Sequence, residues 1–267
     1  MSSIALNSSP GKDSTVKESS QILARVAAFA YGLAPYAAFF ATILYAIGFI
    51  GNWIVPKSID SGASGAVLPS LLINAALLVA FVVQHTIMAR PAFKRWWTGF
   101  VPKSIERSTF VFASCIALGV MFWQWRPLPG VVWDVGQGPA RWVLTGLSLI
   151  GWVTVFLASA MVSHFDLFGL RQVWFRLMNR PYVAVGFRLV GLYKLVRHPL
   201  MLGFLIAFWS APVMTVGHLA FAALVTGYIF MGTWFEERDL IAEHGENYLA
   251  YRRQVRGLVP LPRRTTH

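Results

Sequence analysis

The chain has 267 residues, of which 56% are hydrophobic and only 13% are charged. Soluble globular domains carry about 25% charged residues, so this composition excludes an ordinary soluble fold and indicates a membrane protein. A net charge of +12 would favour nucleic-acid binding in a soluble protein. Here the Lys and Arg residues are concentrated in alternate loops between apolar runs, as the positive-inside rule describes. We therefore expect the lipid bilayer as a partner, and no nucleic acid.

The first 25 residues are polar and rich in serine, and they lack the apolar stretch of a signal peptide. We expect residues 1–25 to be a disordered cytoplasmic tail and residues 26–267 to form a single membrane domain. The single cysteine, Cys115, lies in an apolar run. The sequence therefore predicts neither a disulfide framework nor a metal site built on thiolates.

Five stretches without a charged side chain follow along the chain, at 26–56, 61–89, 108–125, 142–165 and 199–235. A spanning helix needs roughly 20 apolar residues, so the first four stretches predict one transmembrane helix each. The fifth would be about 55 Å long as one helix, and Pro212 and Gly217 interrupt it. It predicts a helical hairpin with arms at about 200–212 and 218–235. The expected fold class is an all-α integral membrane protein with four transmembrane helices, this hairpin and a cytoplasmic helical tail. The oligomeric state is not indicated.

Polar residues gather where these apolar runs begin or end. The four clusters are Gln84 with His85, His164 with Asp166, Arg197 with His198, and Glu236 with Glu237. The charge pattern places both termini and the loops 90–107 and 163–198 in the cytoplasm, so all four clusters are predicted to lie at one membrane face. Ionisable residues at membrane depth are costly and usually mark function, although each cluster alone can equally be an anchor.

The sequence lacks the GxGxxG, P-loop and HExxH motifs, so any cofactor must be held by the membrane helices and the tail. The cations before the hairpin and the anions after it suit a zwitterionic ligand. Arg197 can pair with a carboxylate through two hydrogen bonds, and Glu236 or Glu237 can accept hydrogen bonds from an ammonium group or from ribose hydroxyls.

The segments GLYKLVRHPLMLG (191–203), EERDL (236–240) and HGENYLAYRRQVRGLVP (244–260) resemble the membrane methyltransferases of the isoprenylcysteine carboxyl methyltransferase superfamily. The resemblance implies that S-adenosylmethionine binds at the cytoplasmic face within about 185–260. The positions that match the superfamily motif are Arg197, His198, Pro199, Gly203, Glu236 and Glu237, with Tyr193, Tyr248 and Tyr251 as neighbours. Met201 departs from the motif, which has Tyr at that place.

Three further strings resemble the bacterial methanethiol S-methyltransferases: QHTIMARPAFKRWW (84–97), IERSTFVF (105–112) and HFDLFGLRQVW (164–174). The resemblance implies an enzyme of the bacterial cytoplasmic membrane that methylates a small thiol, methanethiol, to dimethyl sulfide. Two alternatives stay open. The acceptor can be an isoprenylcysteine carboxylate or a lipid amine, or the chain can be a non-catalytic channel or redox accessory protein.

Methyl transfer to a thiol needs the thiolate, so a base should lie near the acceptor. We hypothesise that His85 or His164 takes the thiol proton, with Asp166 orienting the imidazole. The loop 163–190 would then form a lid over the thiol pocket, with Arg171 adding positive potential. The alternative is that both histidines only join helix ends, and that 163–190 is an amphipathic segment at the membrane surface.

Overall fold

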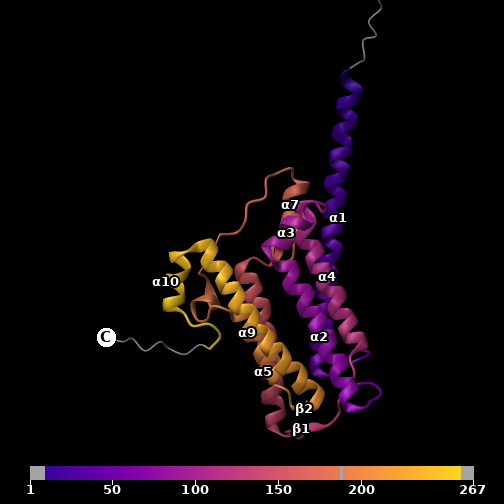
Figure 1. The fold of residues 1–267 in the computed structure, drawn as a ribbon, viewed down its shortest axis with the longest axis vertical. Coiled ribbons are helices and arrows are strands. Elements are labelled where there is room, and N and C mark those ends of the chain that lie inside the picture. The colour runs from indigo at the N-terminus through magenta and orange to yellow at the C-terminus, as the bar shows by residue number, and fades with distance from the viewer. Residues whose placement is uncertain (1–9, 187–188, 260–267) are drawn as a thin grey trace, which may run out of the picture.

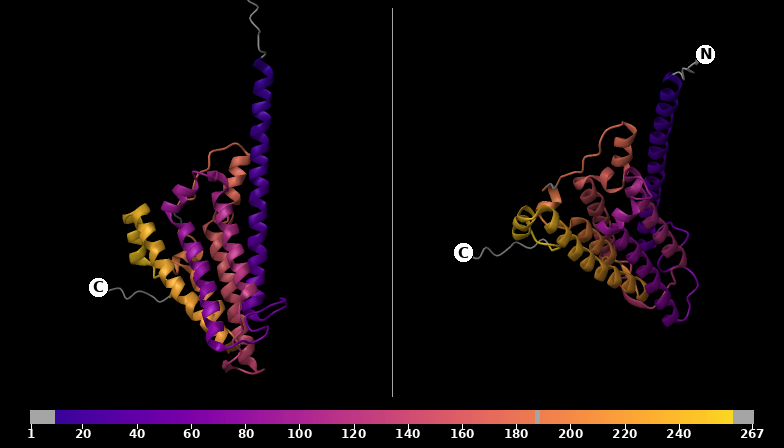
Figure 2. Two further views of the ribbon diagram at one scale, coloured as in Figure 1. Left: turned by 45° about the vertical axis from the view of Figure 1, so that its right-hand side comes forward. Right: turned by 45° about the horizontal axis from the view of Figure 1, so that its top comes forward.

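The computed structural model describes residues 10–186 and 189–259, with side chains from Thr15 onward. In these ranges, the helices that are long and apolar enough to cross a membrane are α1 (Pro10–Gly51), α2 (Val67–Ala89), α4 (Lys103–Gln124), α5 (Pro139–Val162) and α9 (Val216–His244). They lie side by side in one bundle (Figures 1 and 2). The prediction of an all-α integral membrane protein is confirmed.

Shorter elements complete the structure, most of them at the two ends of this bundle. They are α3 (Pro91–Trp97), β1 (Val131–Asp134), α6 (His164–Leu167), α7 (Leu170–Leu177), the 3₁₀ helix η1 (Gly191–Lys194), α8 (Pro199–Trp209), β2 (Val213–Thr215) and α10 (Glu246–Gln254). Figure 1 shows α3, α7 and α10 towards one end and the two strands at the other. The strands pair antiparallel, with Val131 opposite Thr215, and this small sheet was not predicted.

The predicted hairpin is present as α8 and α9. α8 ends before Pro212, the chain then forms β2, and α9 begins at Val216. With 11 residues, α8 is only about 16 Å long and cannot cross the bilayer. It packs against α5 at Gly151 and Gly203, where a Cβ added to either residue would meet the other's carbonyl oxygen at 2.6 or 2.7 Å. Small residues thus let the two backbones touch.

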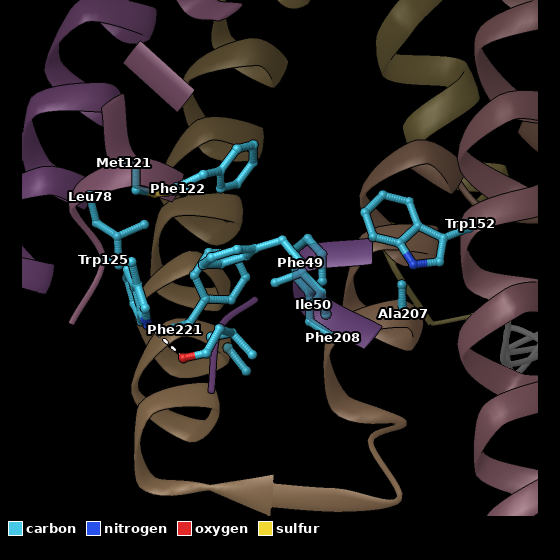
Figure 3. Packing of buried hydrophobic residues seen from close by; sticks show 12 residues of the cluster. Phe49, Ile50, Leu78, Met121, Phe122, Trp125, Trp152, Ala207, Phe208 and Phe221 are labelled. Atoms are coloured by element: carbon cyan, nitrogen blue, oxygen red, sulfur yellow. Dashed lines mark hydrogen bonds between the residues drawn. The ribbon is translucent and has the colours of Figure 1, made fainter. Parts of the chain in front are cut away.

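A cluster of buried aromatic residues fixes the end of the bundle that carries the strands (Figure 3). Trp125 is fully buried and donates its indole N–H to the carbonyl of Ile59 at 3.1 Å. The ring of Phe49 packs 4.8 Å from that of Phe122, and the ring of Phe221 lies edge-on to Trp125 at 5.8 Å. The strand end is therefore a packed core.

The expected disordered tail is wrong from Pro10 onward, because α1 begins there and continues to Gly51. Residues 1–9 lie outside the described residues. The polar segment holds good helix formers such as Lys17, Glu18 and Gln21, and no Gly or Pro stands between Gly11 and the apolar run. Extending a helix that is already nucleated costs little, so the membrane helix continues into the polar segment.

Candidate functional site

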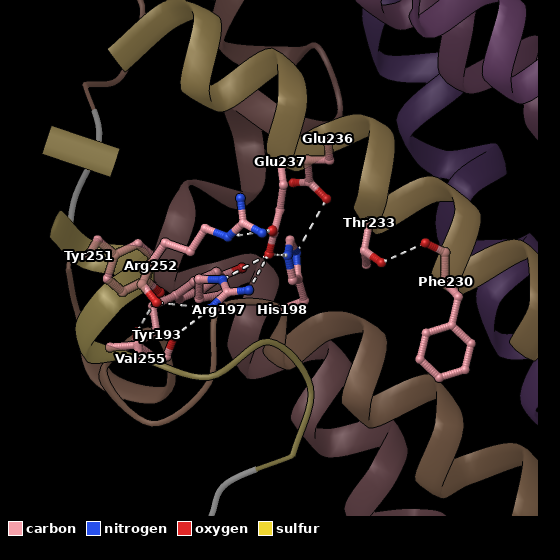
Figure 4. Close-up of polar contacts among 10 residues, drawn as sticks. All are labelled: Tyr193, Arg197, His198, Phe230, Thr233, Glu236, Glu237, Tyr251, Arg252 and Val255. Atoms are coloured by element: carbon pink, nitrogen blue, oxygen red, sulfur yellow. Dashed lines mark hydrogen bonds and ion pairs between the residues drawn. The ribbon is translucent and has the colours of Figure 1, made fainter. Parts of the chain in front are cut away.

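The Arg-His and Glu-Glu clusters on either side of the hairpin meet at one point (Figure 4). Nη2 of Arg197 lies 2.6 Å from Oε1 of Glu237, and Nε of Arg197 donates to the same oxygen at 2.8 Å. Nε of Arg252 lies 3.4 Å from the other oxygen of Glu237. The carboxylate therefore gathers cations from the start of α8 and from the tail.

His198 is the N-cap residue of α8, and its side chain is 5% exposed. Its Nε2 lies 3.1 Å from Oε1 of Glu237, and its Nδ1 lies 3.4 Å from Oε2 of Glu236. Burial disfavours the charged imidazole, but the two carboxylates outweigh it and raise the pKa of His198 above its usual value. A cationic His198 thus holds the two glutamates in place.

The chain after α10 is joined to the Arg-His segment by backbone hydrogen bonds. The amide of Arg197 donates to the carbonyl of Arg256 at 2.8 Å, and the amide of His198 donates to Gly257 at 3.1 Å. The guanidinium of Arg197 also donates through Nη1 to the carbonyl of Val255. These contacts hold the tail against α8 as one wall of a groove.

This open groove has a volume of about 810 Å³. It is lined by Arg197, His198, Phe230, Thr233, Trp234, Glu237, Arg256, Gly257, Leu258 and Val259. Phe230 and Trp234 are 58% and 55% exposed, so the groove offers aromatic faces. The exposed guanidinium of Arg256 has no hydrogen bond or ion pair with residues 15–186 or 189–259.

Sequence reasoning missed Phe230, Thr233, Trp234 and Arg256 as groove residues. The first three lie seven, four and three residues before Glu237, the spacing that places side chains on one face of a helix. That periodicity was a usable signal. Arg256 gave none, because its position depends on how the tail folds back on α8.

Three predicted cofactor contacts are placed differently by the structure. Arg197 was expected to pair with a ligand carboxylate, but its Nε and Nη2 contact Glu237 and its Nη1 contacts backbone carbonyls. Gly203 packs against α5, and Pro199 is buried in the first turn of α8, so neither lines the groove. The Arg-His-Pro segment starts a helix, and proline suits its first turn.

The three tyrosines fasten α10 to the bundle. Tyr248 and Tyr251 are buried, with ring centroids 5.8 Å apart, so they share one face of α10 as predicted. The hydroxyl of Tyr251 donates to the carbonyl of Tyr193 at 2.6 Å, and that of Tyr193 donates to the carbonyl of Ala158 at 3.4 Å. Burial raises the pKa of Tyr251 to about 12, so this phenol stays protonated as a donor. None of the three lines the groove.

His85 lies on α2 among aromatic rings. Its ring centroid is 4.9 Å from that of Phe110 and 5.4 Å from that of Phe81. Its Nδ1 lies 3.2 Å from Oγ of Ser114 on α4. No hydrogen bond joins its Nε2 to any residue of the described ranges.

His164 has partners at both ring nitrogens. Nδ1 lies 3.0 Å from Oγ of Ser159, and Nε2 lies 3.1 Å from the hydroxyl of Tyr36. Five aromatic rings surround it, those of Tyr36, Phe39, Phe40, Phe165 and Phe168. Burial lowers the pKa of His164, so the neutral imidazole is favoured.

Asp166 does not orient His164, contrary to the prediction. Both lie in the four-residue α6, where residues two apart point in different directions. Asp166 instead accepts hydrogen bonds from the hydroxyl of Tyr182 at 2.8 Å and from Arg171 at 3.4 Å. The guanidinium of Arg171 also lies over the rings of Phe175 and Tyr182, at 5.1 and 5.7 Å. Asp166 and Arg171 therefore anchor the segment that follows α7.

His85 on α2 and the groove lie on different sides of α9. The ring of Tyr228 lies 6.4 Å from that of His85, and Asp239 accepts from Arg90 at 3.2 Å, so these α9 positions face α2. At about 100° per residue, Glu237 lies on the opposite side of α9.

Gly232 lies between these two sides of α9, about 40° from Tyr228 and about 100° from Thr233 around the helix axis. Apart from its chain neighbours and the backbone of its own helix, no atom of the described residues lies within 4 Å of the position that a Cβ would take on Gly232. The surface of α9 is therefore open at Gly232, between His85 and the groove.

Similarity to known proteins identifies the family. The chain is 49% identical to "Methanethiol S-methyltransferase" of Mycobacterium tuberculosis over 236 residues, covering 88% of this chain and 97% of that protein. It is 50% identical to "Methanethiol S-methyltransferase 2" of Bradyrhizobium diazoefficiens over 239 residues, covering 90% and 92%. The chain belongs to the methanethiol S-methyltransferase family. Membership of the methanethiol S-methyltransferase family confirms the resemblance drawn from the strings at 84–97, 105–112 and 164–174.

A more distant relative is "Nurim" of Mus musculus, 28% identical over 183 residues that cover 66% of this chain and 70% of that protein. No protein-family model matches the chain, and no solved structure does.

Proposed function

We propose that this chain methylates methanethiol to dimethyl sulfide, using S-adenosylmethionine as the methyl donor. The observation that carries the proposal is the 43–50% identity, over 87–91% of this chain, to six relatives that bear the name methanethiol S-methyltransferase.

The groove beside α9 fits the proposed cofactor. Its 810 Å³ lies within the roughly 300–1,000 Å³ of small-molecule sites. The exposed faces of Phe230 and Trp234 can stack an adenine ring, and Arg256 can donate hydrogen bonds to a carboxylate. Glu236 is not a lining residue, but its carboxylate lies 3.4 Å from the groove residue His198, is 51% exposed and can accept from an ammonium group. When bound, S-adenosylmethionine supplies a methyl group activated by its positively charged sulfur.

Of the two candidate bases, His85 has the available nitrogen. His164 is engaged at Nδ1 by Ser159 and at Nε2 by Tyr36. Among the described residues, His85 has a hydrogen-bond partner only at Nδ1. We therefore assign removal of the thiol proton to Nε2 of His85, and a structural role to His164 between α1 and α5. The rings around His85 keep water away from a thiolate, which preserves its reactivity.

The proposed location is the cytoplasmic membrane of a bacterium, with both termini in the cytoplasm. The end of the bundle with α3, α7 and α10 carries the Lys- and Arg-rich segments, and this end then faces the cytoplasm. The groove would thus open where S-adenosylmethionine is made.

The test is a headspace assay on the protein solubilised in detergent. Given S-adenosylmethionine and methanethiol, it should release dimethyl sulfide, and a prenylated cysteine or a lipid amine should not compete. Folded protein that releases no dimethyl sulfide would contradict the assignment of substrate. Calorimetric titration with S-adenosylhomocysteine tests the cofactor separately, because it needs no thiol.

A further inference from the structure

Ser114 makes a set of hydrogen bonds that determines which nitrogen of His85 carries the proton. Its Oγ lies 3.0 Å from the carbonyl of Phe110, one helical turn earlier on α4. The same oxygen lies 3.2 Å from Nδ1 of His85 and 3.4 Å from Nε2 of Gln84. Ser114 is 9% exposed.

A hydroxyl has one proton to donate and two lone pairs with which to accept. A carbonyl only accepts, so the proton of Ser114 goes to Phe110. Towards His85 and Gln84 the oxygen of Ser114 can then only accept. The amide nitrogen of Gln84 is a donor and fills one of these accepting positions. His85 must fill the other with an N–H, so Nδ1 is its protonated ring nitrogen.

We propose that Ser114 is a positioning residue that holds His85 as the Nδ1–H tautomer, with the lone pair on Nε2. The inference rests on the proposed function, in which Nε2 takes the thiol proton. In that step the S–H bond breaks, its electron pair stays on sulfur, and the proton forms the second N–H of an imidazolium. Ser114 accepts from Nδ1–H before and after the transfer, so no hydrogen bond needs to rearrange.

His164 provides a natural comparison within the same chain. Ser159 donates to the carbonyl of Phe156 at 2.9 Å and lies 3.0 Å from Nδ1 of His164, as Ser114 does with Phe110 and His85. At His164, however, the hydroxyl of Tyr36 occupies Nε2. The same serine arrangement therefore occurs twice, and the lone pair is available only at His85 within the described residues.

The charged and titratable groups near His85 are consistent with this tautomer. Arg107 on α4 acts on His85 electrostatically, and the ring of Tyr228 on α9 lies 6.4 Å away, edge-on. Neither forms a hydrogen bond to the imidazole. In the described part of the chain, Ser114 is thus the group that selects the tautomer.

The test reads the tautomer directly in ligand-free protein labelled with ¹⁵N-histidine, by long-range ¹⁵N–¹H correlation spectra. The wild-type protein should show His85 as Nδ1–H. Ser114→Ala should shift His85 towards the Nε2–H form, whereas Ser114→Thr keeps the hydroxyl and should retain the wild-type pattern. Ser159→Ala is the matched control and should leave the His85 signals unchanged.

Kinetics should follow the tautomer. We expect Ser114→Ala to lower kcat for dimethyl sulfide formation roughly tenfold, with little change in the KM for methanethiol, and Ser114→Thr to restore most of it. An Nε2–H tautomer in the wild-type protein would overturn the inference. So would a Ser114→Ala variant with the wild-type tautomer and rate. If the wild-type protein forms no dimethyl sulfide, the proposed function fails, while the spectra still decide the role of Ser114.

Discussion

Arg197 and Glu237, 40 residues apart in sequence, form an ion pair with 2.6 Å between Nη2 and Oε1. The side chain of Arg197 is 10% exposed and that of Glu237 is 14% exposed. The pair joins the start of α8 to α9 and, through the carbonyl of Val255, also holds the tail. This pair shapes the groove, but it also uses the donors that a ligand would need. The site is therefore built around an internal ion pair.

Removing the charge of Glu237 should strongly destabilise the protein. Breaking one side of a buried ion pair costs about 3–5 kcal/mol, so we expect Glu237→Gln to lower the free energy of unfolding by about 3 kcal/mol. The matched control is Asp239→Asn on the same helix. Its partner is Arg90, the two side chains are 33% and 52% exposed, and its loss should cost about 0–1 kcal/mol. Denaturant titrations in detergent measure both, and equal losses would contradict the prediction.

The stability contributed by His198 should depend on pH. Its folded-state pKa is raised above the usual 6.5, so its stabilisation is complete below about pH 6.5 and is lost as pH rises through the folded-state value. The melting temperature of the wild-type protein should exceed that of His198→Gln more at about pH 6 than at about pH 9. Thermal unfolding across this range measures the difference, and a gap that stays constant or widens with pH would refute the prediction.

The contact between α5 and α8 should not tolerate a methyl group at Gly151. A Cβ there would lie 2.5 Å from the backbone nitrogen of Ala207, so Gly151→Ala should destabilise the protein by about 1–3 kcal/mol. Gly146 lies on the same helix, and apart from its neighbours and the helix backbone no described atom lies within 4 Å of its Cβ position. Gly146→Ala should therefore be neutral or slightly stabilising. Denaturant unfolding of the two variants measures this difference. Similar free energies of unfolding would exclude the close approach of α5 and α8 at Gly151.

The open surface at Gly232 should matter for methyl transfer and not for folding. Filling it by Gly232→Leu places a side chain between the groove and His85, so we expect the rate of dimethyl sulfide formation to fall roughly tenfold or more. Affinity for S-adenosylhomocysteine should change little. Gly227→Leu is the control, since this glycine is exposed and also has open space beside it, but lies about 140° from Gly232 around the helix axis. Equal rates in the two variants would show that the gap at Gly232 is not used.

Arg256 should be the residue that recognises a ligand carboxylate in the groove. We expect Arg256→Gln to weaken the binding of S-adenosylhomocysteine about tenfold to a hundredfold, because a charged hydrogen bond contributes about 1.5–3 kcal/mol. Methylthioadenosine lacks the carboxylate, so its affinity should stay the same. The control is Arg253→Gln, which alters a guanidinium 68% exposed and paired with Glu246 away from the groove. Calorimetry measures all three proteins, and parallel losses for both ligands would contradict this role.

Much of the fold could be predicted because it depends on local composition. Runs of about 20 apolar residues must form helices in a bilayer, where each backbone polar group needs a partner within its own segment. Pro212 and Gly217 marked the break in the hairpin for the same local reason. The one local error, the tail before residue 25, arose because the polar segment has helical residues that extend α1.

The partners of the site residues could not be predicted in this way. The sequence marked Arg197 as a site residue, but it did not show that Glu237 and the tail would take up the donors of its guanidinium. Asp166 was placed beside His164 by sequence proximity, whereas Tyr182, 16 residues away, binds it. Gly203 was assigned to a ligand and is instead buried against α5.

The sequence by itself determined the membrane class, the helices, the hairpin and the residue types gathered at one end of the bundle, because apolar length and charge position act within a segment. Only the tertiary structure decided which side chains meet. His85 contacts Ser114, 29 residues away in sequence, and His164 contacts Tyr36, 128 residues away. Such pairs depend on how far each helix is rotated about its axis and where it crosses its neighbour, which packing across the whole bundle sets.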